Sequence, residues 1–191
     1  MEPVRVFHPF FHLFSGLLPV HWLIRLLLSA SPTGPHLMSL TPATLDAWRR
    51  WRQGFLDNPS LQVLGSPALA TGLAGCAYLM RDQAVLTALK DVLDGAAGDR
   101  WPGVRAAVRT PRAWMLVAGP NAARWRRALK PVLNELPEPV NLYIQAEQLP
   151  GLPKYWPLTW SETTRAVLCR GLECSAPISD LAYLTDTLRD G

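Results

Sequence analysis

Prolines and glycines interrupt this chain so often that we expect only short helices and strands. There are 18 prolines and 13 glycines among its 191 residues. Proline lacks the backbone donor that a helix interior needs, and glycine commonly follows the end of a helix. Stiff connections should therefore separate the elements. Because 49% of the residues are apolar and 18% are charged, these elements can still bury a core, which excludes a wholly disordered chain.

The longest apolar stretch, residues 6–30, lies in an N-terminal segment that we assign to 1–36. A membrane-spanning helix needs about 20 apolar residues with few charges. Pro19 and Arg25 interrupt the stretch, which argues against both a spanning helix and a signal peptide. A core or interfacial helix is the first interpretation, and a membrane anchor and a cleaved signal remain as alternatives. We accordingly predict a cytoplasmic protein, with membrane association through residues 6–30 as the alternative.

Motifs for metals and cofactors are missing. His8 and His12 are four residues apart, but a proline lies between them and no nearby Cys, Asp or Glu completes a ligand set. Neither a dinucleotide fingerprint nor a phosphate loop nor Gly-x-Ser-x-Gly occurs. We predict no metal and no cofactor, and whether the chain is an enzyme stays open.

The charges are unevenly distributed. Residues 95–130 carry a net charge of +7 and residues 131–191 a net charge of −4. The two stretches either neutralise one another in the fold or leave the basic one free for an anionic partner. The motif from Trp48 to Arg52, Trp-Arg-Arg-Trp-Arg, resembles surfaces that bind single-stranded nucleic acid. On a helix its tryptophans can join the core instead, so we predict no nucleic-acid partner and leave a protein partner open.

Residues 37–98 predict a helical hairpin region after a loop at 31–39. Thr41 is a good N-cap followed by proline, and Leu45, Trp48 and Phe55 then share one helix face. The segment 67–94 predicts two antiparallel helices joined at Arg81 and Asp82, with Asp82 capping the second.

Beyond a basic linker or short helix the pattern changes, and residues 110–191 predict a small α/β unit. The expected order is strand, helix, strand, loop, strand, helix, which makes a three-stranded sheet flanked by two helices. Pro131 should kink or split the first helix, and Ser179 can cap the last. The fold class is therefore α+β. The expected strands are Trp114–Ala118, Val140–Gln145 and Thr164–Cys169.

The stretch Ala166-Val-Leu-Cys-Arg-Gly-Leu-Glu-Cys-Ser-Ala-Pro-Ile-Ser-Asp-Leu181 carries a family resemblance. It looks like the C-terminal signature of the thioredoxin-domain-containing proteins related to the spermatogenesis-associated thioredoxin-like protein. Three upstream features occur in the same order as in that family: Leu116 to Pro120, Leu136-Pro137, and Leu149-Pro150 with Leu152-Pro153. The resemblance covers residues 110–190.

The resemblance implies a chain derived from the end of a helical-hairpin barrel similar to sugar epimerases and six-hairpin glycosidases. It does not imply thioredoxin chemistry, because the chain is too short for both family domains and contains no Cys-x-x-Cys. The first hypothesis is a non-catalytic or degenerate relative that acts as a structural or interaction module. The alternatives are a relative with a redox or carbohydrate-processing role, and a membrane-associated protein.

Cys169 and Cys174 are the redox candidates. Arg165 and Arg170 supply the positive charge that favours a thiolate, whereas Glu173 opposes it. Buried structural thiols are the first interpretation, a reversible disulfide the second, and a zinc site completed by other residues the third. With only one further cysteine in the chain there is no disulfide framework, which favours a reducing compartment.

Overall fold

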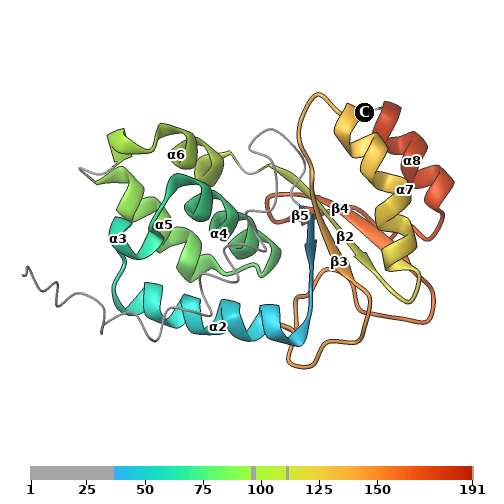
Figure 1. The fold of residues 1–191 in the computed structure, drawn as a ribbon, viewed down its shortest axis with the longest axis horizontal. Coiled ribbons are helices and arrows are strands. Elements are labelled where there is room, and N and C mark those ends of the chain that lie inside the picture. The colour runs from blue at the N-terminus through green and yellow to red at the C-terminus, as the bar shows by residue number, and fades with distance from the viewer. Residues whose placement is uncertain (1–36, 96–97, 111, 191) are drawn as a thin grey trace, which may run out of the picture.

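The computed structural model describes residues 37–95, 98–110 and 112–190, which form an α+β fold as predicted (Figure 1). A group of helices precedes the central strands in the chain, and two further helices lie beyond the sheet on its other side. In chain order the elements are β1 (Leu37–Ser39), α2 (Pro42–Asp57), α3 (Leu61–Leu64), α4 (Pro67–Leu79), α5 (Gln83–Asp94), η1 (Gly98–Arg100), α6 (Pro102–Arg109), β2 (Ala113–Ala118), α7 (Ala122–Glu135), β3 (Asn141–Gln145), β4 (Arg165–Arg170), β5 (Glu173–Cys174) and α8 (Leu181–Asp190).

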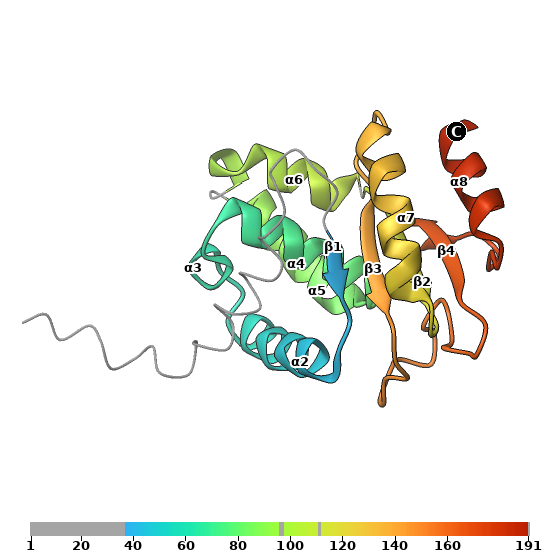
Figure 2. The ribbon, with the colours of Figure 1, turned by 45° about the vertical axis from the view of Figure 1, so that its right-hand side comes forward.

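The strands form one mixed sheet in the order β1-β3-β2-β4-β5. β1 and β2 both pair with β3 in parallel, whereas β4 pairs with β2, and β5 with β4, in the antiparallel sense. The parallel pair β2 and β3 is joined by α7, as the predicted crossover requires. The sheet lies between two helical layers, with α4 and α5 on one side of it and α7 and α8 on the other (Figure 2).

The alternation of side chains along β2 explains the three layers. Trp114, Leu116 and Ala118 face the core shared with the first helices. Met115 and Val117 face the second core, which α7 and α8 complete. All five side chains are buried, so β2 is apolar on both faces, as a central strand between two layers should be.

The predicted helical hairpin is present, and a small residue brings it close to the sheet. A Cβ atom on Gly75 of α4 would lie 3.0 Å from the hydroxyl oxygen of Tyr143 in β3. The absence of a side chain at this position therefore leaves room for the Tyr143 hydroxyl. The helical region 37–98 and the sheet share one continuous hydrophobic core through such contacts.

The sheet is larger than the predicted three strands. Residues 37–39, expected in a loop, form β1 and pair with Leu142 to Ile144 of β3. So short a segment shows no two-residue alternation, and its partner lies a hundred residues away in the chain. The two-residue strand β5 was missed because it exists only as the return of a tight hairpin.

Two details of the last helices differ from expectation. α7 continues through Pro131 as one helix and is not split, because the buried Leu129, Val132 and Leu133 hold both of its halves against the sheet. α8 is capped by Asp180 rather than Ser179. The Asp180 carboxylate accepts hydrogen bonds from the backbone N–H groups of Ala182 at 2.8 Å and Tyr183 at 3.1 Å.

Within the described ranges no helix is both long and apolar enough to cross a membrane. The apolar stretch 6–30 lies outside these ranges, so its proposed membrane association stays a prediction.

Candidate functional sites: a hairpin disulfide and a basic cleft

Cys169 and Cys174 are joined by a disulfide across the β4–β5 hairpin, with their Cα atoms 4.0 Å apart. The chain reverses at Gly171, whose φ of 62° fits the glycine-first two-residue hairpin turn. Cys169 is only 1% exposed and packs in the core, whereas Cys174 is half-buried. Cys174 is therefore the more accessible residue of the pair.

Of the three interpretations of the cysteine pair, the bond fits the second, a reversible disulfide, rather than free buried thiols or a zinc site, and its reversibility stays a prediction. The third cysteine, Cys76, is free and buried in α4, and burial raises the pKa of its thiol to about 12. Cys76 should therefore stay protonated and unreactive while the protein is folded.

The turn between α4 and α5 places an arginine where a glycine is usual. The N–H of Asp82 donates to the carbonyl of Ala77, and the N–H of Arg81 donates to the carbonyl of Tyr78. This is the Schellman pattern, in which the residue at the left-handed position is commonly glycine. Arg81 occupies that position with a φ of 51°. A backbone conformation this uncommon for a side-chain-bearing residue often marks a functional constraint.

The Arg81 side chain connects this turn to the disulfide hairpin. Its Nη2 donates to the carbonyl of Leu172 at 3.0 Å and lies 3.8 Å from the Cys174 sulfur. Its Nε is buried and has no hydrogen-bond partner among the described residues. A fixed positive charge thus lies beside the more accessible sulfur of the disulfide.

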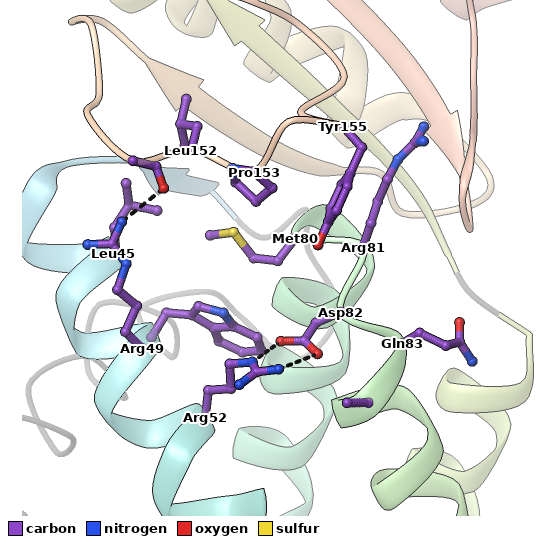
Figure 3. A pocket seen from close by; sticks show the side chains of 13 residues that line it. Leu45, Arg49, Arg52, Met80, Arg81, Asp82, Gln83, Leu152, Pro153 and Tyr155 are labelled. Carbon is purple, nitrogen blue, oxygen red and sulfur yellow. Dashed lines mark hydrogen bonds and ion pairs between the residues drawn. The ribbon is translucent and has the colours of Figure 1, made fainter.

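Below Arg81 is a cleft of about 470 Å³ (Figure 3). One wall comes from α2, the second from the α4–α5 turn and the start of α5, and the third from the connection between β3 and β4. The lining residues are Leu45, Trp48, Arg49, Arg52, Met80, Arg81, Asp82, Gln83, Ala84, Gly151, Leu152, Pro153 and Tyr155.

The polar centre of the cleft is the ion pair between Arg52 and Asp82. The Arg52 Nε donates to one oxygen of the Asp82 carboxylate, and its Nη2 lies 3.4 Å from the other. Asp82 is held in turn as the cap of α5, where it accepts from the N–H of Val85 at 3.3 Å. The hydrogen bond to Asp82 raises the pKa of Arg52 further above its ordinary value, so this cation stays charged at any physiological pH.

The connection from 146 to 164 also lines a second cleft of about 400 Å³. Gln145, the last residue of β3, lies on its wall and is fully buried. The Gln145 Oε1 accepts from the Trp156 indole at 3.2 Å, while its Nε2 has no partner among the described residues. The two clefts share the wall Gly151–Pro153. A long connection without secondary structure thus shapes both cavities, which is typical of binding loops.

Among the described side chains no ion pair joins residues 95–130 to residues 131–191. Arg105 and Arg109 instead pair with Asp94, just before the basic stretch, and Arg170 pairs with Glu138. On α7 the basic side chains are exposed to solvent. They are Arg124, Arg126, Arg127 and Lys130.

Across residues 37–95, 98–110 and 112–190, no three His, Cys, Asp or Glu side chains come together as a metal site would require. His8 and His12 lie outside those ranges, so the prediction for them remains untested.

The cleft was not predicted, although part of its signal lies in the Trp48–Arg52 motif. Trp48 and Trp51 are buried with their ring centroids 5.2 Å apart, as the core interpretation requires. Arg49 and Arg52 are three residues apart and therefore share the helix face beside them. The sequence gives no sign that both arginines face a loop a hundred residues later, where Arg49 donates to the carbonyl of Gly151 at 3.0 Å.

No protein-family model, curated protein or solved structure matches the chain. The resemblance of residues 110–190 to the thioredoxin-domain-containing proteins therefore remains a prediction from the motif.

Proposed function

We propose that this chain is a thiol–disulfide module in which the Cys169–Cys174 bond is reduced and re-formed. The observation that supports this most directly is the fixed guanidinium of Arg81 beside the half-buried Cys174 sulfur. Positive charge next to an accessible sulfur favours the thiolate that takes part in exchange. The uncommon backbone conformation of Arg81 further supports a functional role for its side chain.

The exchange begins with an external dithiol. One thiolate of the dithiol attacks the Cys174 sulfur, the Cys169–Cys174 bond breaks, and Cys169 leaves as a thiolate that takes up a proton. In the mixed disulfide the first sulfur of the dithiol is bonded to Cys174. The second thiolate of the dithiol then attacks that first sulfur and releases Cys174. The external reagent becomes a disulfide, and the protein gains two electrons and one proton, which Cys169 takes up, while Cys174 stays a thiolate beside Arg81. Arg81 contacts the reacting Cys174 sulfur directly, and its positive charge stabilises the released thiolate.

A cytoplasmic location belongs to the same proposal. Disulfides in the cytosol are usually transient, because the thiol pool keeps most cysteines reduced, and those that form are commonly catalytic or redox-sensing. A distant relationship to the thioredoxin-domain-containing proteins is compatible with such a role, but the module would then use a pair of cysteines five residues apart in place of Cys-x-x-Cys.

Thiol titration of the folded protein tests the proposal. Before reduction no thiol should react, because Cys76 is buried. After treatment with dithiothreitol, reactive thiol should appear while the circular dichroism of the protein remains that of the folded state. A bond that yields to dithiothreitol only in the presence of denaturant would contradict the redox function.

The role of Arg81 is measured on the single accessible thiol of a Cys169→Ala variant. We expect the rate at which Cys174 reacts with iodoacetamide near neutral pH to fall several-fold when Arg81→Met is added, and to be largely kept with Arg81→Lys. Arg50→Met is the matched control, because Arg50 is an exposed arginine of α2 that does not line the cleft. Equal rates in all three variants would remove Arg81 from the mechanism.

The second candidate function is a non-catalytic structural or interaction module, as first predicted from the sequence. The burial of Cys169 favours it, because a sulfur packed in the core is a poor participant in exchange. Tyr155 and Leu172 are exposed apolar side chains available to a protein partner. A disulfide that resists dithiothreitol in the folded protein would select this function over the first.

A further inference from the structure

We infer that the cleft between α2, the α4–α5 turn and residues 151–155 binds a small anionic ligand, a phosphate or a carboxylate attached to an apolar body, through Arg52. No step of the disulfide chemistry requires this site. Its volume of about 470 Å³ lies in the ordinary range for small-molecule sites.

Arg52 has the geometry of a prepared anion receptor. Its Nε and Nη2 contact Asp82, whereas the Nη1 group has no hydrogen-bond partner among the described residues. The Asp82 side chain is only 10% exposed and that of Arg52 36%, so the buried partner fixes an arginine that solvent still reaches. Because Asp82 is itself fixed as the α5 cap, little side-chain entropy is lost when a ligand binds the remaining donors.

The charge around the cleft favours an anion even though Asp82 pairs with Arg52. Arg49, Arg52 and Arg81 line the cleft, and the carboxylate of Asp82 is the one acidic group in its lining. Arg49 pairs with Asp46 at 2.8 Å just outside the lining, so Arg81 supplies the positive charge that these two carboxylates leave unbalanced. Gln83 and Ala84 belong to the first turn of α5 and also line it, so the positive end of that helix adds to the field. Arg81 directs its guanidinium away from Asp82, which leaves Arg52 as the arginine at the centre of the cleft (Figure 3).

The remaining walls determine the other half of the ligand. Apolar side chains from all three walls surround the ion pair, and the Tyr155 ring is 52% exposed. The accessible part of this lining comes from Leu152, Pro153 and Tyr155, because Leu45, Trp48 and Met80 are at most 6% exposed. An aromatic or aliphatic body attached to the anionic group would cover these three side chains and exclude water from the Arg52 contact. The apolar lining residues are Leu45, Trp48, Met80, Leu152 and Pro153.

Phenylphosphate, benzoate and benzyl alcohol are suitable probes, because they share a ring and differ in the polar group. We would titrate each into the oxidised protein and follow the side-chain N–H signals of arginine and tryptophan by NMR. Phenylphosphate and benzoate should shift the Arg52 signal, and the stronger of the two identifies the preferred anion. Benzyl alcohol should bind at least about tenfold more weakly, since it lacks the charged acceptor.

Variants of two arginines in α2 distinguish binding at Arg52 from nonspecific electrostatic attraction of the anion to a basic protein. Arg52→Met should weaken phenylphosphate binding at least about tenfold, and Arg52→Lys should recover only part of it because lysine lacks the planar fork. Arg50→Met removes the same charge from the same helix and should change affinity less than about twofold. Thermal melting checks that each variant is folded.

Unchanged affinity in folded Arg52→Met would overturn the inference, as would shifts confined to the exposed arginines of α7. The disulfide stays intact throughout the titration. Either result therefore tests the anion site independently of whether the disulfide is redox-active.

Discussion

The two faces of the sheet are covered in different ways. α7 and α8 cover one face with almost purely aliphatic contacts, and both helices are close in sequence to the strands they cover. The helices of residues 42–109 cover the other face, where the contacts include Trp114, Tyr143, Tyr78 and Cys76. We call these the aliphatic face and the aromatic face. The candidate sites belong to the aromatic side, where the packing is less simple.

The two faces differ in their polar contacts and titratable side chains. On the aromatic face Tyr78 donates its hydroxyl to the carbonyl of Val108 at 2.6 Å, and Trp114 donates its indole N–H to the carbonyl of Gly171 at 3.0 Å. These bonds tie the helices and the hairpin turn to specific polar atoms. The aliphatic face has no titratable side chain among the described members of its core. Changes of pH and redox state should therefore act first on the aromatic face.

The largest effect should come from truncating either core. Leu73→Ala on the aromatic face and Leu129→Ala on the aliphatic face each remove a side chain that is at most 1% exposed, and each should lower the free energy of unfolding by about 2–5 kcal/mol. Because the central strands are shared, we expect one cooperative transition in both variants. Urea unfolding followed by circular dichroism and by amide hydrogen exchange measures this.

Separate unfolding transitions would show that the two faces do not unfold cooperatively. If Leu73→Ala melted α4 and α5 while amides of α7 and α8 stayed protected, the two faces would be independent folding units. The same experiment on Leu129→Ala is the matched control for the opposite side.

Alkaline pH should weaken the aromatic face selectively. Burial raises the pKa of the Cys76 thiol to about 12 and also raises the pKa values of Tyr78 and Tyr143. These groups are neutral when protonated, so above about pH 9 the unfolded chain releases the thiol proton while the folded protein keeps it. Stability is therefore lost as pH rises, by about 2 kcal/mol between pH 9 and 10.5 for Cys76 alone.

Cys76→Ala isolates that contribution. Between pH 9 and 10.5 the free energy of unfolding of Cys76→Ala should fall less than that of the wild type. The difference between the two losses should be about 2 kcal/mol. Urea unfolding of both proteins at each pH is the measurement. Parallel losses in the two proteins would mean that Cys76 is not protected from ionisation by the fold.

Reducing the hairpin disulfide should cost about 2 kcal/mol in the chain-entropy model, because the bond closes a short loop of sequence separation five. Cys169 packs on the aromatic face, so hydrogen exchange should rise in the hairpin and at the α4–α5 turn, which Arg81 links to it. Amides of α7 should keep their protection. Equal increases on both sides would show that the bond stabilises the whole sheet rather than one face.

The helices of both faces were largely predictable from the sequence, whereas the contacts between distant segments on the aromatic face were not. In α7 the spacing of Trp125, Leu129 and Val132 determines a stripe that needs only the neighbouring strands as partners. The aromatic face instead depends on contacts between distant segments, such as Arg81 with Leu172. Periodicity describes one element at a time, so it indicated that Asp82 caps a helix but not that the same carboxylate holds Arg52 in a cleft.

The smallest effect concerns the cap of α8, where prediction and structure disagree by one residue. Asp180→Ala removes an acceptor that satisfies the N–H groups of Ala182 and Tyr183, and should destabilise the protein by about 1 kcal/mol. Ser179→Ala is the matched control and should change stability by no more than about 0.5 kcal/mol. Thermal unfolding of the two variants decides between the residues. Because α8 covers only the aliphatic face, the loss in Asp180→Ala should leave the reactivity of Cys174 unchanged, whereas a parallel change in that reactivity would mean that the two faces are coupled through β4.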